Sequence, residues 1–134
     1  MKVVLANGCF DLLHVAHKRH LEQAAKFGEF LVVGVTKDKH VGKGPGRPVI
    51  KEDERLEMVK ALKCVAAAEL CRDSLEALRR WKPDVFCKGG DYKEKGLLAE
   101  ERLYCMENGI EIRFTDPNPQ TTSALVRKIK CVSY

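Results

Sequence analysis

The chain has 134 residues, of which 45% are hydrophobic and 32% are charged, and its formal net charge at pH 7 is +5. Because a domain usually takes about 100–200 residues, this length predicts one globular domain, residues 1–134, with its own core. The longest nearly unbroken apolar stretch, residues 30–35, is far shorter than the roughly 20 residues of a membrane span. The composition excludes a disordered chain, and the short apolar N-terminal run is not typical of a secretory signal.

The six cysteines form no recognisable metal or redox motif. No two of them stand in a Cys-x-x-Cys pair, which argues against a zinc ribbon and against a thioredoxin-like site. Most of them have apolar neighbours, so we expect small buried side chains rather than a disulfide framework. This cysteine usage and the missing secretory signal predict a cytoplasmic protein.

Strand-like and helix-like patterns alternate along the chain. Short apolar runs bounded by turn residues predict strands, and apolar residues at helical spacing with polar caps predict helices. In chain order, we expect a strand at 2–6, a helix at 14–26, a strand at 30–35, a helix at 51–63, a strand at 65–70, a helix at 73–81, a strand at 84–87, a helix at 97–108, a strand at 110–114 and a helix at 122–130.

This alternation predicts an α/β fold, a single Rossmann-like doubly wound domain with a five-stranded parallel sheet. Ligands bind such sheets outside the carboxyl ends of the strands. Chemistry-bearing residues do follow the predicted strands, at 8–17, 37–48, 88–92 and 116–123. We therefore expect these four segments to meet at one edge of the sheet.

The segment from residue 37 to residue 51 is basic and rich in glycine. It holds five lysines and arginines against a single acid, Asp38, together with three glycines. A flexible basic loop of this kind suits a small, multiply charged anion. Elsewhere the basic residues are spread along the chain, so no nucleic-acid partner and no membrane partner are expected.

His14 and His17 mark the start of the first predicted helix, directly after a strand and a glycine turn. A helix start offers free N–H groups and the positive end of its dipole, and residues three apart share one face. Two imidazoles there can hold successive phosphates and stabilise charge on a phosphorus under attack. The same histidines could instead be ordinary polar residues of a helix start. A metal site with His20 is the other alternative, but no further ligand is suitably spaced, so we expect none.

Two phosphate-binding fingerprints are absent from this segment. Dinucleotide binding typically needs Gly-x-Gly-x-x-Gly after the first strand, whereas Gly8 stands alone. A P-loop needs Ser or Thr after Gly-Lys, whereas Gly42-Lys43 is followed by Gly44.

The sequence Gly8-Cys-Phe-Asp-Leu-Leu-His-Val-Ala-His17 resembles the signature of the cytidylyltransferase-like nucleotidyltransferase superfamily, in which His-x-Gly-His follows a Gly-x-Phe-Asp turn. Thr121-Thr-Ser123 resembles the second signature of that superfamily. Lys43-Gly-Pro-Gly-Arg-Pro48 and Lys88-Gly-Gly-Asp-Tyr92 are similar to motifs of the D-glycero-β-D-manno-heptose 1-phosphate adenylyltransferases. In that group, the domain is often fused to a sugar kinase.

The resemblance implies transfer of AMP from ATP to a sugar 1-phosphate of the heptose type, with release of pyrophosphate and formation of an ADP-sugar for a surface polysaccharide such as lipopolysaccharide. It also implies Mg²⁺ that arrives with the nucleotide, a homodimer, and a separate upstream kinase. One alternative is a cytidylyltransferase that makes a CDP-alcohol from CTP and glycerol 3-phosphate or a related polyol phosphate. Another is a nucleotide-binding module without turnover.

The sequence departs from the family pattern at two places, and the second leaves the choice between ATP and CTP open. Ala16 stands where the motif has glycine, and we expect its methyl group to be tolerated. Residues 116–120 lack the arginine of the glycerol phosphate group, which weakens the CTP alternative.

The resemblance also assigns roles to residues. His14, His17 and Lys43 are predicted to be catalytic, and Asp11, Lys43 and Arg47 to bind the acceptor. Arg55 is expected to pair with neighbouring carboxylates. The nucleotide-binding residues are predicted to be Gly8, Cys9, Phe10, His14, His17, Gly89, Gly90, Asp91, Thr121, Thr122 and Ser123.

Overall fold

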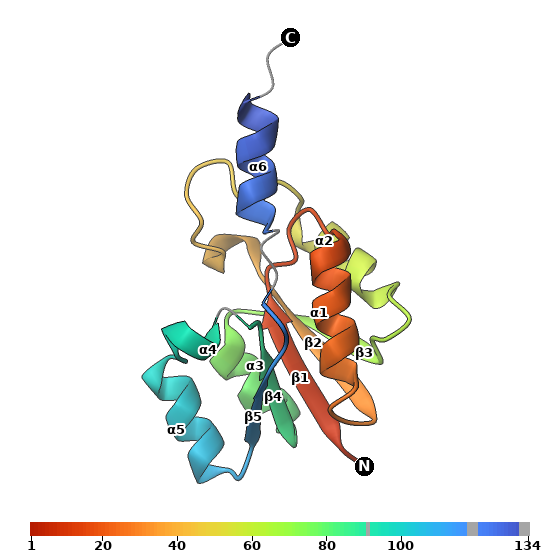
Figure 1. The fold of residues 1–134 in the computed structure, drawn as a ribbon, viewed down its shortest axis with the longest axis vertical. Coiled ribbons are helices and arrows are strands. Elements are labelled where there is room, and N and C mark those ends of the chain that lie inside the picture. The colour runs from red at the N-terminus through yellow and green to blue at the C-terminus, as the bar shows by residue number, and fades with distance from the viewer. Residues whose placement is uncertain (91, 118–120, 132–134) are drawn as a thin grey trace.

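Five parallel strands form one sheet at the centre of the molecule (Figure 1). The computed structural model describes residues 1–90, 92–117 and 121–131. The strand order is β3-β2-β1-β4-β5. Every neighbouring pair is parallel, which confirms the predicted five-stranded parallel sheet. The strands are β1 (Val3–Gly8), β2 (Phe30–Thr36), β3 (Ala67–Cys71), β4 (Val85–Lys88) and β5 (Glu111–Phe114).

Helices cover both faces of the sheet, and the last helix extends beyond the carboxyl ends of the strands (Figure 1). One face packs against α1 and α2, and the other packs against α3 and α5. This arrangement confirms the predicted doubly wound α/β fold. The helices are α1 (Val15–Ala25), α2 (Glu52–Lys60), α3 (Ser74–Trp81), α4 (Tyr92–Lys95), α5 (Ala99–Glu107) and α6 (Thr122–Cys131), with a short 3₁₀ turn at Asp38–His40.

The strand β1 shows how one strand serves two cores. Val4 faces the core under α1 and α2, whereas Leu5 faces the core under α3 and α5, and both side chains are fully buried. Successive side chains of a strand point to opposite faces, so a central strand of a doubly wound sheet is apolar throughout. This is why residues 30–35 of β2 read as a continuous apolar run in the sequence.

The boundaries of several elements differ from the predicted ones. β1 continues to Gly8, because Asn7 and Gly8 pair with β2. α2 ends at Lys60, and the residues after it form turns that lead into β3. The four-residue helix α4 was not predicted.

The cysteines are free, and three of the six are buried: Cys71, Cys87 and Cys105. Burial raises the pKa of Cys71 and Cys87 to about 12, so these two thiols stay protonated at neutral pH. Cys131 is exposed, unlike the buried cysteines that the sequence led us to expect. Within the described residues, no helix is both long enough and apolar enough to cross a membrane.

Candidate active site

A cavity of about 280 Å³ opens at the carboxyl ends of the strands. The strand order reverses between β1 and β4, and crevices at such a switch point are where doubly wound folds bind ligands. A second cavity of about 240 Å³ adjoins the first over the end of β1. The two share six lining residues, which makes them lobes of one site: His17, His20, Lys43, Gly89, Tyr92 and Thr122.

His14 and His17 build the start of α1 with their own side chains. The backbone N–H of Ala16 donates to His14 Nδ1 at 3.2 Å, and the backbone N–H of His14 donates to His17 Nδ1 at 3.2 Å. This reciprocal capping satisfies two N–H groups that a helix start would otherwise leave unpaired. Because each Nδ1 accepts a hydrogen bond, a neutral ring must carry its proton on Nε2.

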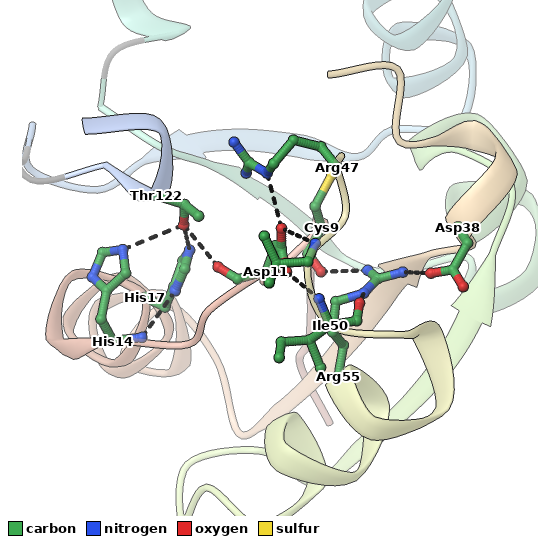
Figure 2. A network of polar contacts seen from close by, with 10 residues as sticks. Cys9, Asp11, His14, His17, Asp38, Arg47, Ile50, Arg55 and Thr122 are labelled. Carbon is green, nitrogen blue, oxygen red and sulfur yellow. Dashed lines mark hydrogen bonds and ion pairs between the residues drawn. The ribbon is translucent and has the colours of Figure 1, made fainter. Parts of the chain in front are cut away.

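The two Nε2 atoms converge on Thr122 Oγ1, at 3.4 Å from His14 and 3.3 Å from His17 (Figure 2). The Thr122 hydroxyl donates to the carbonyl of Asp11 at 2.8 Å, which joins the start of α6 to the turn after β1. The first signature of the sequence thereby meets the second, although they are more than 100 residues apart in the chain. Both Nε2 atoms therefore meet at the Thr122 hydroxyl, and all three residues line the first lobe.

Burial keeps both imidazoles neutral at physiological pH. Loss of solvent, with the nearby charges of His14, Lys43 and His20, lowers the pKa of His17 from 6.5 to about 4. Burial also lowers the pKa of His14. At pH 7 the site therefore offers hydrogen-bond donors whose protons are held firmly, rather than two permanent cations.

A second helix also begins at the cavity. Thr121 caps α6, because its Oγ1 accepts from the backbone N–H of Ala124 at 3.0 Å. Thr121, Thr122 and Ser123 all line the first cavity. The starts of α1 and α6 both lie at the first lobe, so two positive dipole ends are directed at one space, which favours a multiply charged anion.

Asp11 lies beneath the site as an anchor for the basic loop. The residue is 1% exposed, and its side chain accepts from Arg47 Nε at 3.0 Å, from the Val49 N–H at 2.9 Å and from the Ile50 N–H at 3.0 Å. Burial alone would raise the pKa of Asp11, but these hydrogen bonds and the Arg47 charge outweigh it, and the pKa lies below 3.8. The carboxylate is therefore ionised and occupied by the protein itself.

Arg47 does not line either lobe. Its side chain is 9% exposed and pairs with Asp11, and its Nη2 is buried with no hydrogen-bond partner among the described residues. Acceptor binding by Asp11 and Arg47 stays a prediction. What the structure shows is that the pair holds residues 47–50 against the turn after β1.

Arg55, on α2, connects the same turn to the start of the basic loop (Figure 2). It is 2% exposed and donates to the Cys9 carbonyl at 2.6 Å, to the Ile50 carbonyl at 2.9 Å and to Asp38 at 2.7 Å. The predicted pairing with a neighbouring carboxylate is thus present in the structure. This network fixes the backbone of Cys9 and Phe10 under the second lobe.

Lys43 lies on the glycine-rich loop and lines both lobes with an exposed side chain. Gly42 and Gly44 flank it with φ angles of +62° and +91°. Residues other than glycine rarely adopt this backbone conformation, so the two glycines let the loop bring Lys43 to the cavity.

The opposite wall of the first lobe consists of Gly89 and Gly90 after β4 and of Thr115 and Asp116 after β5. A Cβ atom on Gly90 would collide with the backbone of Thr115, Asp116 and Pro117. Glycine is therefore required there for the two strand ends to pack together. Asp91, predicted to bind the nucleotide, lies outside the described residues.

The structure brings most of the predicted site residues to the two lobes. Ala16 also lines the first lobe, with 8% of its surface exposed. Sequence reasoning missed His20 as a site residue, and also Tyr92, Thr115 and Asp116. Thr115 and Asp116 directly follow a strand, so the rule that ligands meet strand ends could have found them. Within the described ranges, no group of three or more His, Cys, Asp or Glu side chains is arranged to hold a metal ion.

Comparison with known proteins identifies the family. Residues 5–129 match the sequence model of the family described as Cytidylyltransferase-like. The chain belongs to this cytidylyltransferase-like family. The family resemblance predicted from the motifs is thereby confirmed, and the chain is a nucleotidyltransferase domain.

The cytidylyltransferase-like chain is similar to curated proteins named Bifunctional protein HldE. It is 39% identical to the one from Citrifermentans bemidjiense over 133 residues, which are 96% of this chain and 27% of that protein. It is 40% identical to the one from Koribacter versatilis over 115 residues, which are 83% of this chain and 24% of that protein. The chain thus spans about a quarter of the length of these relatives.

Solved structures share the fold of this cytidylyltransferase-like domain. A crystal structure titled as the lipopolysaccharide core biosynthesis protein from Thermoplasma volcanium superposes with a TM-score of 0.71 and 31% identity, covering 90% of this chain and 99% of that one. A protein of unknown function from Archaeoglobus fulgidus gives a TM-score of 0.65 at 21% identity, over 90% of this chain and 94% of that one. The second likeness supports the fold alone.

Proposed function

We propose that the protein transfers the adenylyl group of ATP to a sugar 1-phosphate of the heptose type, releasing pyrophosphate and forming an ADP-sugar. The observation that carries this proposal is the convergence of His14 Nε2 and His17 Nε2 at the meeting point of two helix starts. A chain of phosphates needs several N–H donors in one place, and this arrangement supplies them. The curated relatives and the glycine motifs at 43–48 and 88–92 favour the adenylyl and heptose choices.

In the proposed reaction, a phosphate oxygen of the acceptor attacks the α-phosphorus of ATP in line. The bond from the α-phosphorus to the bridging oxygen breaks, and pyrophosphate leaves with the bonding electrons. His14 and His17 donate hydrogen bonds to phosphate oxygens and stabilise the charge that builds up on the α-phosphate. No covalent enzyme intermediate is needed, because positioning and charge stabilisation carry this type of chemistry.

Lys43 serves the acceptor side of the proposed site. Its ammonium group is on a loop that reaches both lobes, so it can bridge the acceptor phosphate and the α-phosphate. The start of α6, with Thr121, Thr122 and Ser123, holds the β- and γ-phosphates through hydroxyl and backbone N–H groups. Gly89 and Gly90 let the base or the ribose approach the backbone of the opposite wall.

The residues of the site fit a triphosphate that brings its own Mg²⁺. Histidines, a lysine, hydroxyl groups and helix N–H groups line the first lobe, with Asp116 as its single carboxylate among the described residues. Such donors bind phosphate oxygens, whereas Mg²⁺ prefers oxygen ligands in an octahedral arrangement. When bound to the nucleotide, Mg²⁺ neutralises part of the phosphate charge.

Two further parts of the proposal derive from the resemblance alone. The sugar 1-phosphate acceptor is the product of a kinase reaction, and we propose that a separate kinase supplies it. We also propose a homodimer.

Pyrophosphate release in the presence of Mg²⁺ tests the proposal. ATP, CTP, GTP and UTP are each combined with heptose 1-phosphate, with other sugar 1-phosphates and with glycerol 3-phosphate. Release with ATP and a sugar 1-phosphate is the expected result. Release only with CTP and glycerol 3-phosphate would favour the cytidylyltransferase alternative, and triphosphate binding without release from any pair would favour the non-catalytic module.

A further inference from the structure

His20 lies one turn after His17 on α1 and lines both lobes of the site. Its Nδ1 is 2.7 Å from Thr115 Oγ1, on the residue that directly follows β5. His20 and Thr115 are 95 residues apart in the chain. This hydrogen bond therefore connects the phosphate-binding helix to the far edge of the sheet.

A second contact runs parallel to the first. The backbone N–H of Asp116 donates to Gln23 Oε1 at 2.8 Å, and Gln23 lies one turn beyond His20 on α1. Two successive turns of the helix thus hold two successive residues after β5. The segment 115–116 is fixed in place by side chains of α1.

The same segment determines where Gly90 lies. The backbone N–H of Thr115 donates to the Lys88 carbonyl at 3.0 Å, and Gly90 packs directly on the backbone of residues 115–117. A shift of residues 115–117 would therefore move the wall that faces His14 and His17 across the cavity.

We propose that His20 is a positioning residue that fixes the distance between the phosphate-binding start of α1 and the wall of residues 89–90 and 115–116. A nucleotide that spans this gap binds tightly only when both sides are correctly spaced. The inference rests on the proposed nucleotide binding, and it adds a role for a histidine outside the signature motif.

The fold of α1 does not depend on His20. Leu21 and Ala24 anchor the helix in the core with no exposed surface, whereas His20 is half-buried. The start of the helix is capped by His14 and His17. Replacing His20 should therefore leave the helix in place and release the contact with Thr115.

The test compares His20→Leu and Thr115→Val, alone and together, with the wild-type chain. Calorimetry measures binding of an ATP analogue with a methylene group between the α- and β-phosphates, and kinetics measures KM for ATP and kcat. One hydrogen bond corresponds to a change of about 3- to 10-fold, so each single variant should raise Kd and KM for the nucleotide by that factor. The value of kcat should change less than about twofold, because His14, His17 and Lys43 are all present and burial, the largest cause of the low pKa of His17, does not depend on His20.

Three further variants separate positioning from a general structural effect. His20→Asn keeps a polar atom near the place of Nδ1 and should restore part of the affinity. The double variant should bind no worse than either single variant, because both remove the same contact. Glu22→Gln, which breaks an exposed ion pair with Lys18 on the same helix, should bind like the wild type.

Unchanged affinity in His20→Leu, or fully additive losses in the double variant, would overturn the positioning role while leaving the proposed function intact. Failure of the wild-type chain to bind the analogue would instead overturn the proposed function, and the positioning role with it.

Discussion

Two backbone N–H groups determine the chemistry that His14 and His17 can perform. Each occupies the Nδ1 atom of one imidazole, so the proton of each neutral ring is on Nε2 and points at Thr122 Oγ1, in the wall of the cavity. The spacing of three residues that the sequence motif requires is the spacing between a helix cap and its partner in the first turn. The motif therefore caps the helix start through the two Nδ1 atoms and orients the two Nε2–H groups.

Substitutions of His17 can separate these two functions. His17→Asn keeps a polar atom near Nδ1, so it should retain the cap and the melting temperature, but it should lower kcat by about 100- to 1,000-fold. His17→Gln keeps a polar atom near Nε2, so it should lose part of the cap and retain more activity. Pyrophosphate release and thermal melting measure the two effects, and equal activity in both variants would contradict the assignment.

The low pKa of His17 also predicts how stability depends on pH. The pKa is about 4 in the folded chain and about 6.5 in the unfolded chain, so the unfolded chain takes up a proton that the folded chain does not. The free energy of unfolding should therefore be unaffected by this group above pH 6.5 and should decrease as the pH falls towards 4. Urea denaturation across this range should show a smaller decrease in His17→Gln, and equal slopes would refute the assigned shift.

Asp11 supports the site through a buried ion pair. Asp11→Asn leaves the Arg47 guanidinium buried without its counter-charge, which is expected to destabilise the fold by about 3–5 kcal/mol. Asp38→Asn is the matched control, because Asp38 is 38% exposed and Arg55 keeps two carbonyl acceptors. Denaturant unfolding should show the larger loss for Asp11→Asn, and similar losses for the two variants would contradict the anchoring role.

At the scale of elements, apolar runs and turn residues were sufficient to predict the strands of the sheet and the longer helices that pack on it. They failed where pairing with another segment determines the outcome. β1 extends through Asn7 and Gly8 because β2 continues beside it, and no local pattern reveals that neighbour. α4 is only four residues long, too short to show a helical period.

In the candidate site too, features that depend on local sequence could be predicted, and contacts between distant segments could not. His14 and His17 could be predicted because their residue type and their place after a strand indicate phosphate chemistry, and Lys43 and Thr122 could be predicted through the family resemblance. The burial of Arg47 against Asp11 and the contact of His20 with Thr115 could not be predicted, because each joins segments that are distant in the chain.

Gly90 tests whether the close packing of the segments that follow β4 and β5 is needed for nucleotide binding. Gly90→Ala adds a methyl group where the backbone of residues 115–117 already lies, so that segment must move. We expect nucleotide affinity to fall by at least about tenfold, which is about 1.4 kcal/mol. Gly109→Ala is the control, because its φ of +65° makes alanine strained but the added Cβ has open space. It should lower stability by about 1–2 kcal/mol and leave affinity unchanged.

At the scale of the whole molecule, the topology gathers four distant segments at one edge. The reversal of strand order beside β1 opens the cavity, the start of α1 and the start of α6 supply its donors, and the basic loop adds Lys43. The sheet and its two cores hold these parts in fixed relative positions. Each part alone is a common feature of proteins, and their convergence is what favours nucleotidyl transfer.

The most direct test of the proposed reaction follows the phosphorus-containing products of ATP and of the acceptor in one experiment. Wild-type protein is incubated with ATP, Mg²⁺ and heptose 1-phosphate, and ³¹P nuclear magnetic resonance records the products. The account predicts an ADP-sugar and pyrophosphate in equal amounts, both strongly reduced with His17→Asn. Formation of ADP and inorganic phosphate in their place, or no consumption of ATP and heptose 1-phosphate, would contradict the proposed reaction.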